Sequence, residues 1–291
     1  MTSRIMRHLL GIAAVVLLGG LISASLVRFS PGYATDERQL DTRLSSESLQ
    51  ALQASRAGER NIVHFYFKYL AGILTGDLGT SHTFGQPVRA LLQDRIPATF
   101  RLVALGLTLG WALALSLALS AALFRVTAYS TTTVAISGAL LCIPAAVLAL
   151  ASVLLRTPGY LAIALIVFPK LFTYTRNLLA NGYASPHVIA ARAKGLSELR
   201  ILFWHVLPTC APSLLALTGV SVSLALGAAI PVEALCGIAG IGDLAWQAAL
   251  SRDLPLLVNI TILVTSVTLL ANSSADVIVH RLSFSGYDRR A

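Results

Sequence analysis

Charged residues are scarce in this chain of 291 residues. Asp, Glu, Lys and Arg together make up 12% of it, whereas 56% is hydrophobic and the mean hydropathy is +0.75. A soluble core does not bury that much apolar surface, so the composition predicts a chain embedded in a lipid bilayer. The net charge of +9 does not indicate nucleic-acid binding, because the basic residues are interleaved with long apolar runs.

The sequence also lacks the features of an enzyme or of an ion-coupled carrier. It contains no Gly-x-x-x-x-Gly-Lys-Ser/Thr loop, which excludes an ATP site of that kind. The three cysteines and the scattered histidines have no metal-ligand or nucleophile spacing, so we assign no catalytic residue, metal or cofactor. The apolar runs are nearly free of carboxylates apart from Asp276, which argues against a proton- or sodium-coupled transporter.

Six apolar runs are present, and crossing a bilayer takes about 20 residues. They cover residues 9–27, 99–124, 133–155, 160–179, 214–232 and 256–279. The fourth run is short, and it gains length if Lys170 and Arg176 extend toward the headgroups. The predicted fold class is therefore an all-α polytopic membrane protein with six transmembrane helices.

Basic residues set the predicted orientation. Arg4 and Arg7 precede the first run, and the positive-inside rule then places both the N- and the C-terminus in the cytoplasm. Small residues at 23–25 imitate a signal-peptidase site, but the run is longer than a usual signal sequence, so we favour a retained helix. The first predicted segment is thus residues 1–27, the N-terminus with its transmembrane helix.

Residues 28–98 carry many charges of both signs, which predicts a sizeable extracytoplasmic loop domain after the first helix. Residues 99–291 then form the transmembrane core. Within it, Gly106 and Gly110 predict close helix packing, and Pro144 predicts a kink in the third helix. The three glycines within residues 233–253 predict a short external re-entrant or interfacial segment.

The segment at about 180–212 is predicted to be a pair of capped helices in a cytoplasmic loop. Ser185 is a suitable N-cap for the first helix. Gly195 is expected to end this helix, because glycine readily adopts the left-handed backbone conformation. Ser197 begins the second helix, and Pro208 is expected to end it. A basic cytoplasmic loop with no docking partner would also contain such helix-capping residues, so this pattern alone does not establish a docking site.

The run Ala191-Arg192-Ala193-Lys194-Gly195-Leu196, with His205 and Pro212 downstream, decides between these interpretations. It resembles the coupling loop of binding-protein-dependent ABC importer permeases of the oligopeptide, dipeptide and nickel transport family. Two external motifs resemble the same family and occur in the right order. The first begins with Gly76, Asp77 and Gly79, and the second contains Glu233, Gly240 and Gly242.

This resemblance implies a permease subunit that forms half of a translocation path for di- or oligopeptides. The implied partners are a second homologous permease subunit, two cytoplasmic ATP-binding subunits that hydrolyse ATP, and an extracytoplasmic solute-binding protein. The implied location is the bacterial inner membrane. An importer of nickel or another small solute is the alternative within the family, and a secondary transporter or a noncatalytic membrane scaffold is the alternative outside it.

Overall fold

The computed structural model describes residues 76–124 and 127–287, together with residues 11, 15, 17–22, 25 and 72. This part of the chain is helical and contains no strand, only an isolated bridge between Thr80 and Pro87. The chain divides into two compact units. One comprises residues 1–96 and 244–266, and the other comprises residues 97–243 and 267–291.

Helix α4, Val88–Phe124, begins eleven residues before the predicted start of the second transmembrane helix and passes through Pro97. Its first amide bonds reach the carbonyl of Pro87, which precedes the helix. The hydropathy of the sequence located only residues 99–124 of this helix, because its first turns are helical but carry charged residues. At 1.5 Å per residue a helix of 37 residues is about 55 Å long, well beyond the roughly 30 Å hydrocarbon core.

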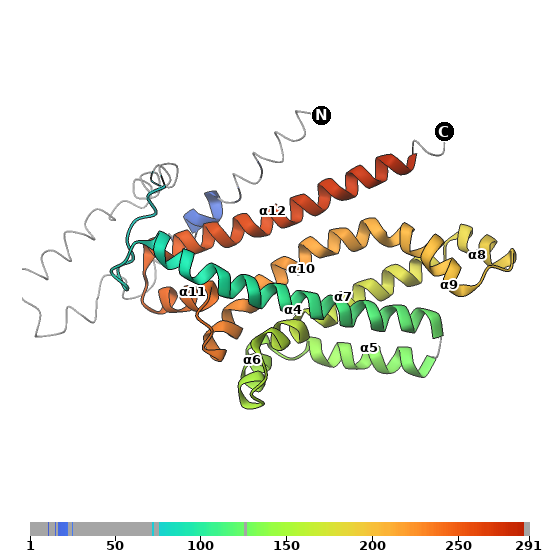
Figure 1. Cartoon of the computed structure of the whole chain (residues 1–291), viewed down its shortest axis with the longest axis horizontal. Coiled ribbons are helices and arrows are strands. Elements are labelled where there is room, and N and C mark those ends of the chain that lie inside the picture. The colour runs from blue at the N-terminus through green and yellow to red at the C-terminus, as the bar shows by residue number, and fades with distance from the viewer. Residues whose placement is uncertain are drawn as a thin grey trace, which may run out of the picture. The chain divides into compact units, whose positions relative to one another are not determined.

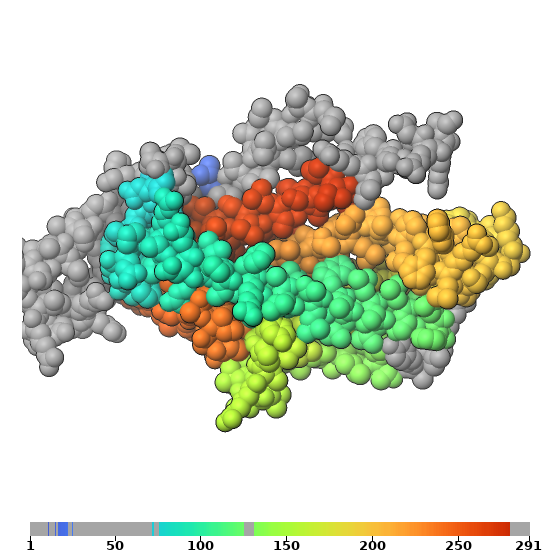
Figure 2. Space-filling model, in the orientation of Figure 1, coloured from blue at the N-terminus to red at the C-terminus, as the bar shows by residue number. Residues whose placement is uncertain are grey.

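The predicted kink at Pro144 is a complete break. Helix α5, Thr127–Leu141, and helix α6, Ala145–Leu154, are separate and lie at 96° to each other (Figure 1). Pro144 has extended backbone at the N-cap of α6, because proline lacks an amide hydrogen and its ring prevents the helix from continuing. Figure 2 shows α6 projecting from its own unit, and Leu154 and Leu155 at its end are exposed.

Helix α7, Gly159–Tyr183, is the centre of the larger unit and contacts α5, α6 and α10. Eleven of its residues are buried, and the rings of Phe168 and Phe172 stack at 5.8 Å. A Cβ on Gly106 would lie 2.5 Å from the side chain of Ile163, so α4 crosses α7 at a distance that only glycine permits. This contact confirms the close packing predicted from the small residues of α4.

The rest of the chain is α8, Pro186–Ala193; α9, Glu198–Ile201; the π-helix η2, Leu202–Val206; α10, Leu207–Cys236; α11, Ile241–Leu250; and α12, Leu254–Tyr287. The predicted stop at Pro208 is wrong. A π-turn lets the helix continue past this proline, whose missing amide falls in the first turn of α10. The segment predicted as re-entrant contains the regular helix α11.

In the described part of the chain, three helical stretches are long and apolar enough to cross a membrane: Val88–Phe124, Glu198–Cys236 and Leu254–Val279. The bent pair Thr131–Leu141 and Ala145–Leu154 makes a fourth if its two halves form one crossing. These stretches coincide with the predicted second, fifth, sixth and third helices. The predicted fourth helix is α7, and most of the predicted first helix lies outside the described residues, so the count of six stays a prediction.

Candidate functional site

The short helix α8 has the ends that the sequence predicts. Ser185 is its N-cap in extended conformation, although the Ser185 hydroxyl bonds back to the carbonyl of Gly182 rather than capping an amide. At the other end Gly195 has φ +78°. The amide of Leu196 donates to the carbonyl of Ala191, and the amide of Gly195 to that of Arg192. This is a Schellman ending, and it confirms the predicted left-handed glycine.

An ion pair closes the turn between α8 and α9. The Nε and Nη2 atoms of Arg192 donate to the two carboxylate oxygens of Glu198, at 3.0 and 3.3 Å. Both side chains are about 40% exposed, so the pair fixes geometry more than it stabilises the fold. Glu198 lies in the first turn of α9, and nothing in the sequence alone identified Arg192 as its partner.

The structure separates the predicted coupling residues into two sets. Ala191 is buried in the core of the unit. Arg192, Ala193, Lys194 and Gly195 are exposed in one continuous run, which we call the α8 surface, and Leu196 is half-buried beside it.

His205 of η2 lies next to α8. Its ring makes an edge contact with His187, with 6.5 Å between centroids, and its carbonyl accepts the Thr209 hydroxyl at 2.8 Å. The contact joins the start of α8 to the π-helix. His205 is half-buried and thus belongs to the support of the α8 surface rather than to the surface itself.

The second external motif forms a buried junction between α10 and the first turn of α11. Glu233 is fully buried, and its Oε2 accepts the amides of Gly242 at 2.6 Å and Asp243 at 3.2 Å. The Thr99 hydroxyl accepts the amide of Ile241 at 2.7 Å. Glu233 therefore neutralises the positive end of α11 with a carboxylate from the end of α10.

Both glycines of this motif are required by packing. A Cβ on Gly240 would lie 2.3–2.5 Å from the Glu233 carboxylate. A Cβ on Gly242 would lie 2.8–2.9 Å from the backbone of Ile230 and Ala229. The spacing of Glu233, Gly240 and Gly242 thus encodes a close contact between two helices.

The first external motif belongs to a separate cluster within the smaller unit. Gly76 and Gly79 have φ +82° and +73°, and the Asp77 carboxylate accepts the amide of Gly79 at 2.9 Å. The Asn259 amide group donates to the carbonyl of Leu78 at 3.0 Å, which ties this turn to α12.

Asp253 holds the same loop from the N-cap of α12. Its Oδ2 accepts the Ser81 hydroxyl at 2.5 Å and the Thr83 amide at 2.9 Å, and its Oδ1 accepts the Leu256 amide at 3.2 Å. The side chain of Asp253 is 1% exposed. The predicted turn signature around Gly76 and the run around Asp253 are therefore two halves of one structure.

These clusters bind protein groups to one another and contain no reactive pair. Within the described residues, no three His, Cys, Asp or Glu side chains lie close enough to hold a metal ion. The clusters fix the ends and junctions of helices, and the α8 surface is an exposed basic run beside them.

Comparison with known proteins agrees with this arrangement. Residues 106–284 match the family described as "Binding-protein-dependent transport system inner membrane component". The chain belongs to this family. The match begins within α4 and ends within α12, so it contains α8, the Glu233 junction and Asp253.

Curated members of the family resemble the chain over most of its length. A putative peptide transport system permease protein of Brucella abortus is 24% identical over 88% of this chain and 89% of its own length. The oligopeptide transport system permease protein OppB is 29% identical in Salmonella typhimurium and 28% in Escherichia coli K12, over 88% of this chain and 90% of OppB in both.

A solved structure shares the fold. An inward-facing form of the MetNI methionine ABC transporter covers 66% of this chain and 96% of its own chain, with a TM-score of 0.59 and 17% identity. At that identity the likeness shows the fold alone. This chain is thus a transport component of the membrane, and a permease by family.

Replacing Gly195 tests the ending of α8. We expect Gly195→Ala to destabilise the turn by about 1 kcal/mol, because alanine is strained at φ +78° and no other atom lies within 4 Å of the added methyl. Gly195→Asn is the matched control, since asparagine tolerates this conformation. Amide exchange of residues 194–198 should rise in the alanine variant only. Equal exchange in both variants would contradict a conformational role for Gly195.

Proposed function

We propose that this chain is a permease subunit of an ATP-driven importer and forms half of a translocation path for peptides delivered by a solute-binding protein. The observation that carries the proposal is the α8 surface, an exposed basic run on a helix whose two ends are fixed. The matched family and the OppB relatives support the class and favour peptides as the solute. The sequence contains no Gly-x-x-x-x-Gly-Lys-Ser/Thr loop, so we assign ATP hydrolysis to partner subunits.

The α8 surface is the proposed dock for a cytoplasmic ATP-binding subunit. The buried Ala191 anchors α8 to the core, and the ion pair between Arg192 and Glu198 fixes the following turn. A rigid, exposed element of this kind transmits a displacement, whereas a loose basic loop absorbs it.

Helix α10 provides the mechanical link. It continues from η2 without interruption for 30 residues, about 45 Å, and Glu233 lies in its last turn. A movement imposed at α8 and η2 therefore reaches the junction with α11 through a single helix. ATP-driven closure at one end and binding of a loaded solute-binding protein at the other would bias the same two-state element.

The proposed topology follows the charge asymmetry. Residues 28–98 and α11 are extracytoplasmic, whereas α8, α9 and both termini are cytoplasmic, in a bacterial inner membrane. In a cysteine-free background, an impermeant thiol reagent added outside should label Gln86→Cys and leave Ser197→Cys unlabelled. Both positions are exposed, so the opposite pattern would reverse the topology.

The dock is tested by introducing a negative charge at Ala193. We expect Ala193→Glu to reduce co-purification of the ATP-binding subunit on the order of tenfold, because an unpaired charge is costly in a protein interface. Peptide uptake should fall with it. Ala249→Glu is the matched control, an exposed alanine on α11 that should retain the subunit. Normal co-purification and uptake with Ala193→Glu would remove the dock from the proposal.

Ala191 is not a usable site for this test. Ala191 has the same side chain as Ala193 and lies two positions away, but it is only 5% exposed. A bulky or charged side chain there would disturb the core of the unit, so a transport defect would say nothing about docking.

A further inference from the structure

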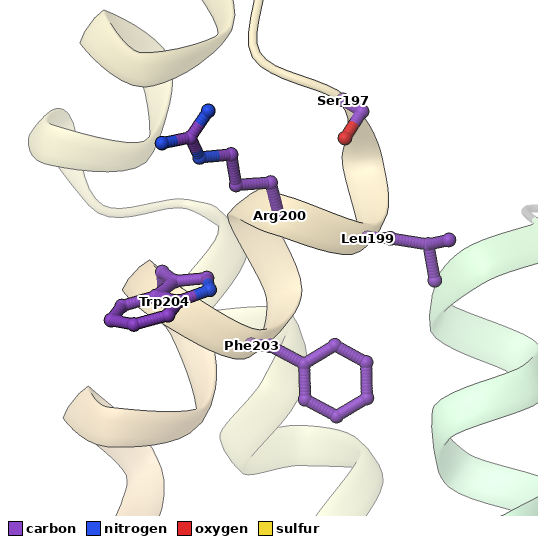
Figure 3. Close-up of a pocket in the computed structure, with 5 residues that line it drawn as sticks. All are labelled: Ser197, Leu199, Arg200, Phe203 and Trp204. Atoms are coloured by element: carbon purple, nitrogen blue, oxygen red, sulfur yellow. The ribbon is translucent and has the colours of Figure 1, made fainter.

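A pocket beside α9 and η2 is separate from the α8 surface. It has a volume of about 530 Å³ and is lined by Ser197, Leu199, Arg200, Phe203 and Trp204 (Figure 3). Trp204 is 75% exposed, and Phe203 and Leu199 are more than half exposed. Figure 3 shows the guanidinium of Arg200 and the indole of Trp204 on the same side of the helix. Aromatic groups this exposed need a cover that the described part of the chain does not supply.

Arg200 is the charged residue of this pocket. The neighbouring Arg192 is paired with Glu198, but within the described part of the chain no hydrogen bond or ion pair involves the Arg200 guanidinium. Ser197 supplies a hydroxyl at the rim. A guanidinium and a hydroxyl that line the same pocket are suited to a phosphate group.

An apolar groove of about 610 Å³ adjoins the pocket at Phe203, which lines both. The groove lies between α4 and α10, and Trp111 and Thr218 are the residues in it with polar groups. Its other members are apolar: Leu115, Phe203, Leu207, Pro208, Ala211, Leu214 and Leu215. The groove runs along the helix from Phe203 to Thr218, a distance of fifteen residues or about 22 Å. This length exceeds the depth of one leaflet of the hydrocarbon core, which is roughly 15 Å.

We propose that the pocket and the groove together bind one anionic phospholipid of the cytoplasmic leaflet. Arg200 and Ser197 hold its phosphate, Trp204 lies at the level of the headgroups, and an acyl chain occupies the groove along α10. A phospholipid has the same order of groups, a charged phosphate followed by a long apolar chain. The charged residue of the lining is the cation Arg200, which favours an anionic lipid over a zwitterionic one. Tryptophan is preferred at this depth of a membrane.

The position of the site gives the lipid a role in this chain. Residues Glu198–Cys236 form a helical stretch of 39 residues, far longer than a crossing requires. A lipid held at Arg200 and Trp204 would fix where this stretch leaves the bilayer and would thus set the height of η2 and α9 above it. The inference concerns the bilayer and does not depend on which solute is carried.

A photo-crosslinking amino acid in place of Trp204 tests the site. We would place the full chain in nanodiscs with equal amounts of phosphatidylglycerol and phosphatidylcholine and identify the adduct by mass. The expected adduct is phosphatidylglycerol, in about fivefold excess over phosphatidylcholine. Arg200→Gln should remove the excess, Ala211→Phe should lower both adducts by filling the groove, and the control Lys194→Gln should change neither.

Equal labelling of the two lipids, or an excess that survives Arg200→Gln, would overturn the proposal. So would the absence of an adduct, or an adduct with the ATP-binding subunit when the assembled importer is used. The same crosslinker at Ile189, which is exposed on α8, tests the dock independently. A subunit adduct at 189 with no lipid adduct at 204 would retain the proposed function and reject the lipid site.

Discussion

Gly240→Ala should strongly destabilise the junction between α10 and α11. The added methyl would lie 2.3–2.5 Å from the carboxyl atoms of Glu233, a distance that real contacts do not reach. Glu233 has no room to withdraw, since it is fully buried and accepts the amides of Gly242 and Asp243. The variant must either separate α11 from α10 or break these bonds, at a cost of about 3 kcal/mol.

Thermal unfolding in detergent measures this effect. We expect an apparent melting temperature lower on the order of 5–10 °C for Gly240→Ala. Gly227→Ala is the matched control, since it changes a glycine of α10 whose Cβ would meet nothing within 4 Å. A wild-type melting temperature for Gly240→Ala would contradict the described junction.

A double-mutant cycle identifies the cause. Glu233→Ala alone should also destabilise the chain, because it leaves buried amides of α11 without an acceptor. It removes the group that the Gly240 methyl would strike, so the double variant should be more stable than the sum of the two single effects predicts. Additive effects would mean that Gly240 acts through something other than Glu233.

Asp253→Ala should release the loop of residues 77–87 from α12. The substitution removes the acceptor of the Ser81 hydroxyl and of the Thr83 amide, and it removes the N-cap of α12 at the same time. Donors left unsatisfied in a buried site cost about 1–3 kcal/mol each, and loss of a cap costs about 1 kcal/mol. The loop is short and has few other anchors, so we expect it to open locally before the helices unfold.

Hydrogen exchange reads this opening directly. Amides of residues 77–87 should exchange on the order of a hundredfold faster in Asp253→Ala, which corresponds to about 3 kcal/mol of lost protection. Asp276→Ala is the matched control, because it makes the same change at an exposed carboxylate of α12. Unchanged exchange of the loop in Asp253→Ala would show that other contacts hold it.

Features that depend on local chemistry followed from the sequence. The left-handed Gly195 was predicted because only residues near it decide how α8 ends, and its φ of +78° confirms the prediction. The apolar runs located the candidate crossings in the same way, since hydropathy is a property of each segment. The motif around Ala191 indicated the family, and the match over residues 106–284 confirms it.

The consequences of the prolines were only partly predicted. Pro144 was expected to bend a helix and breaks it, whereas Pro208 was expected to end a helix and is carried through by a π-turn. The ring clash and the lost amide are the same in both cases. The structure places a π-turn directly before Pro208 and none before Pro144, and nothing local in the sequence distinguishes the two prolines.

Contacts between distant residues were decided by the tertiary structure alone. Ser81 and Asp253 are 172 residues apart in sequence, and nothing local to either indicates the hydrogen bond between them. Ala191 and Ala193 have the same side chain two positions apart, yet one is buried and the other exposed, because α8 turns a different face to the core at each. A sequence specifies what each residue is able to bond, but which partner it meets depends on how the helices pack.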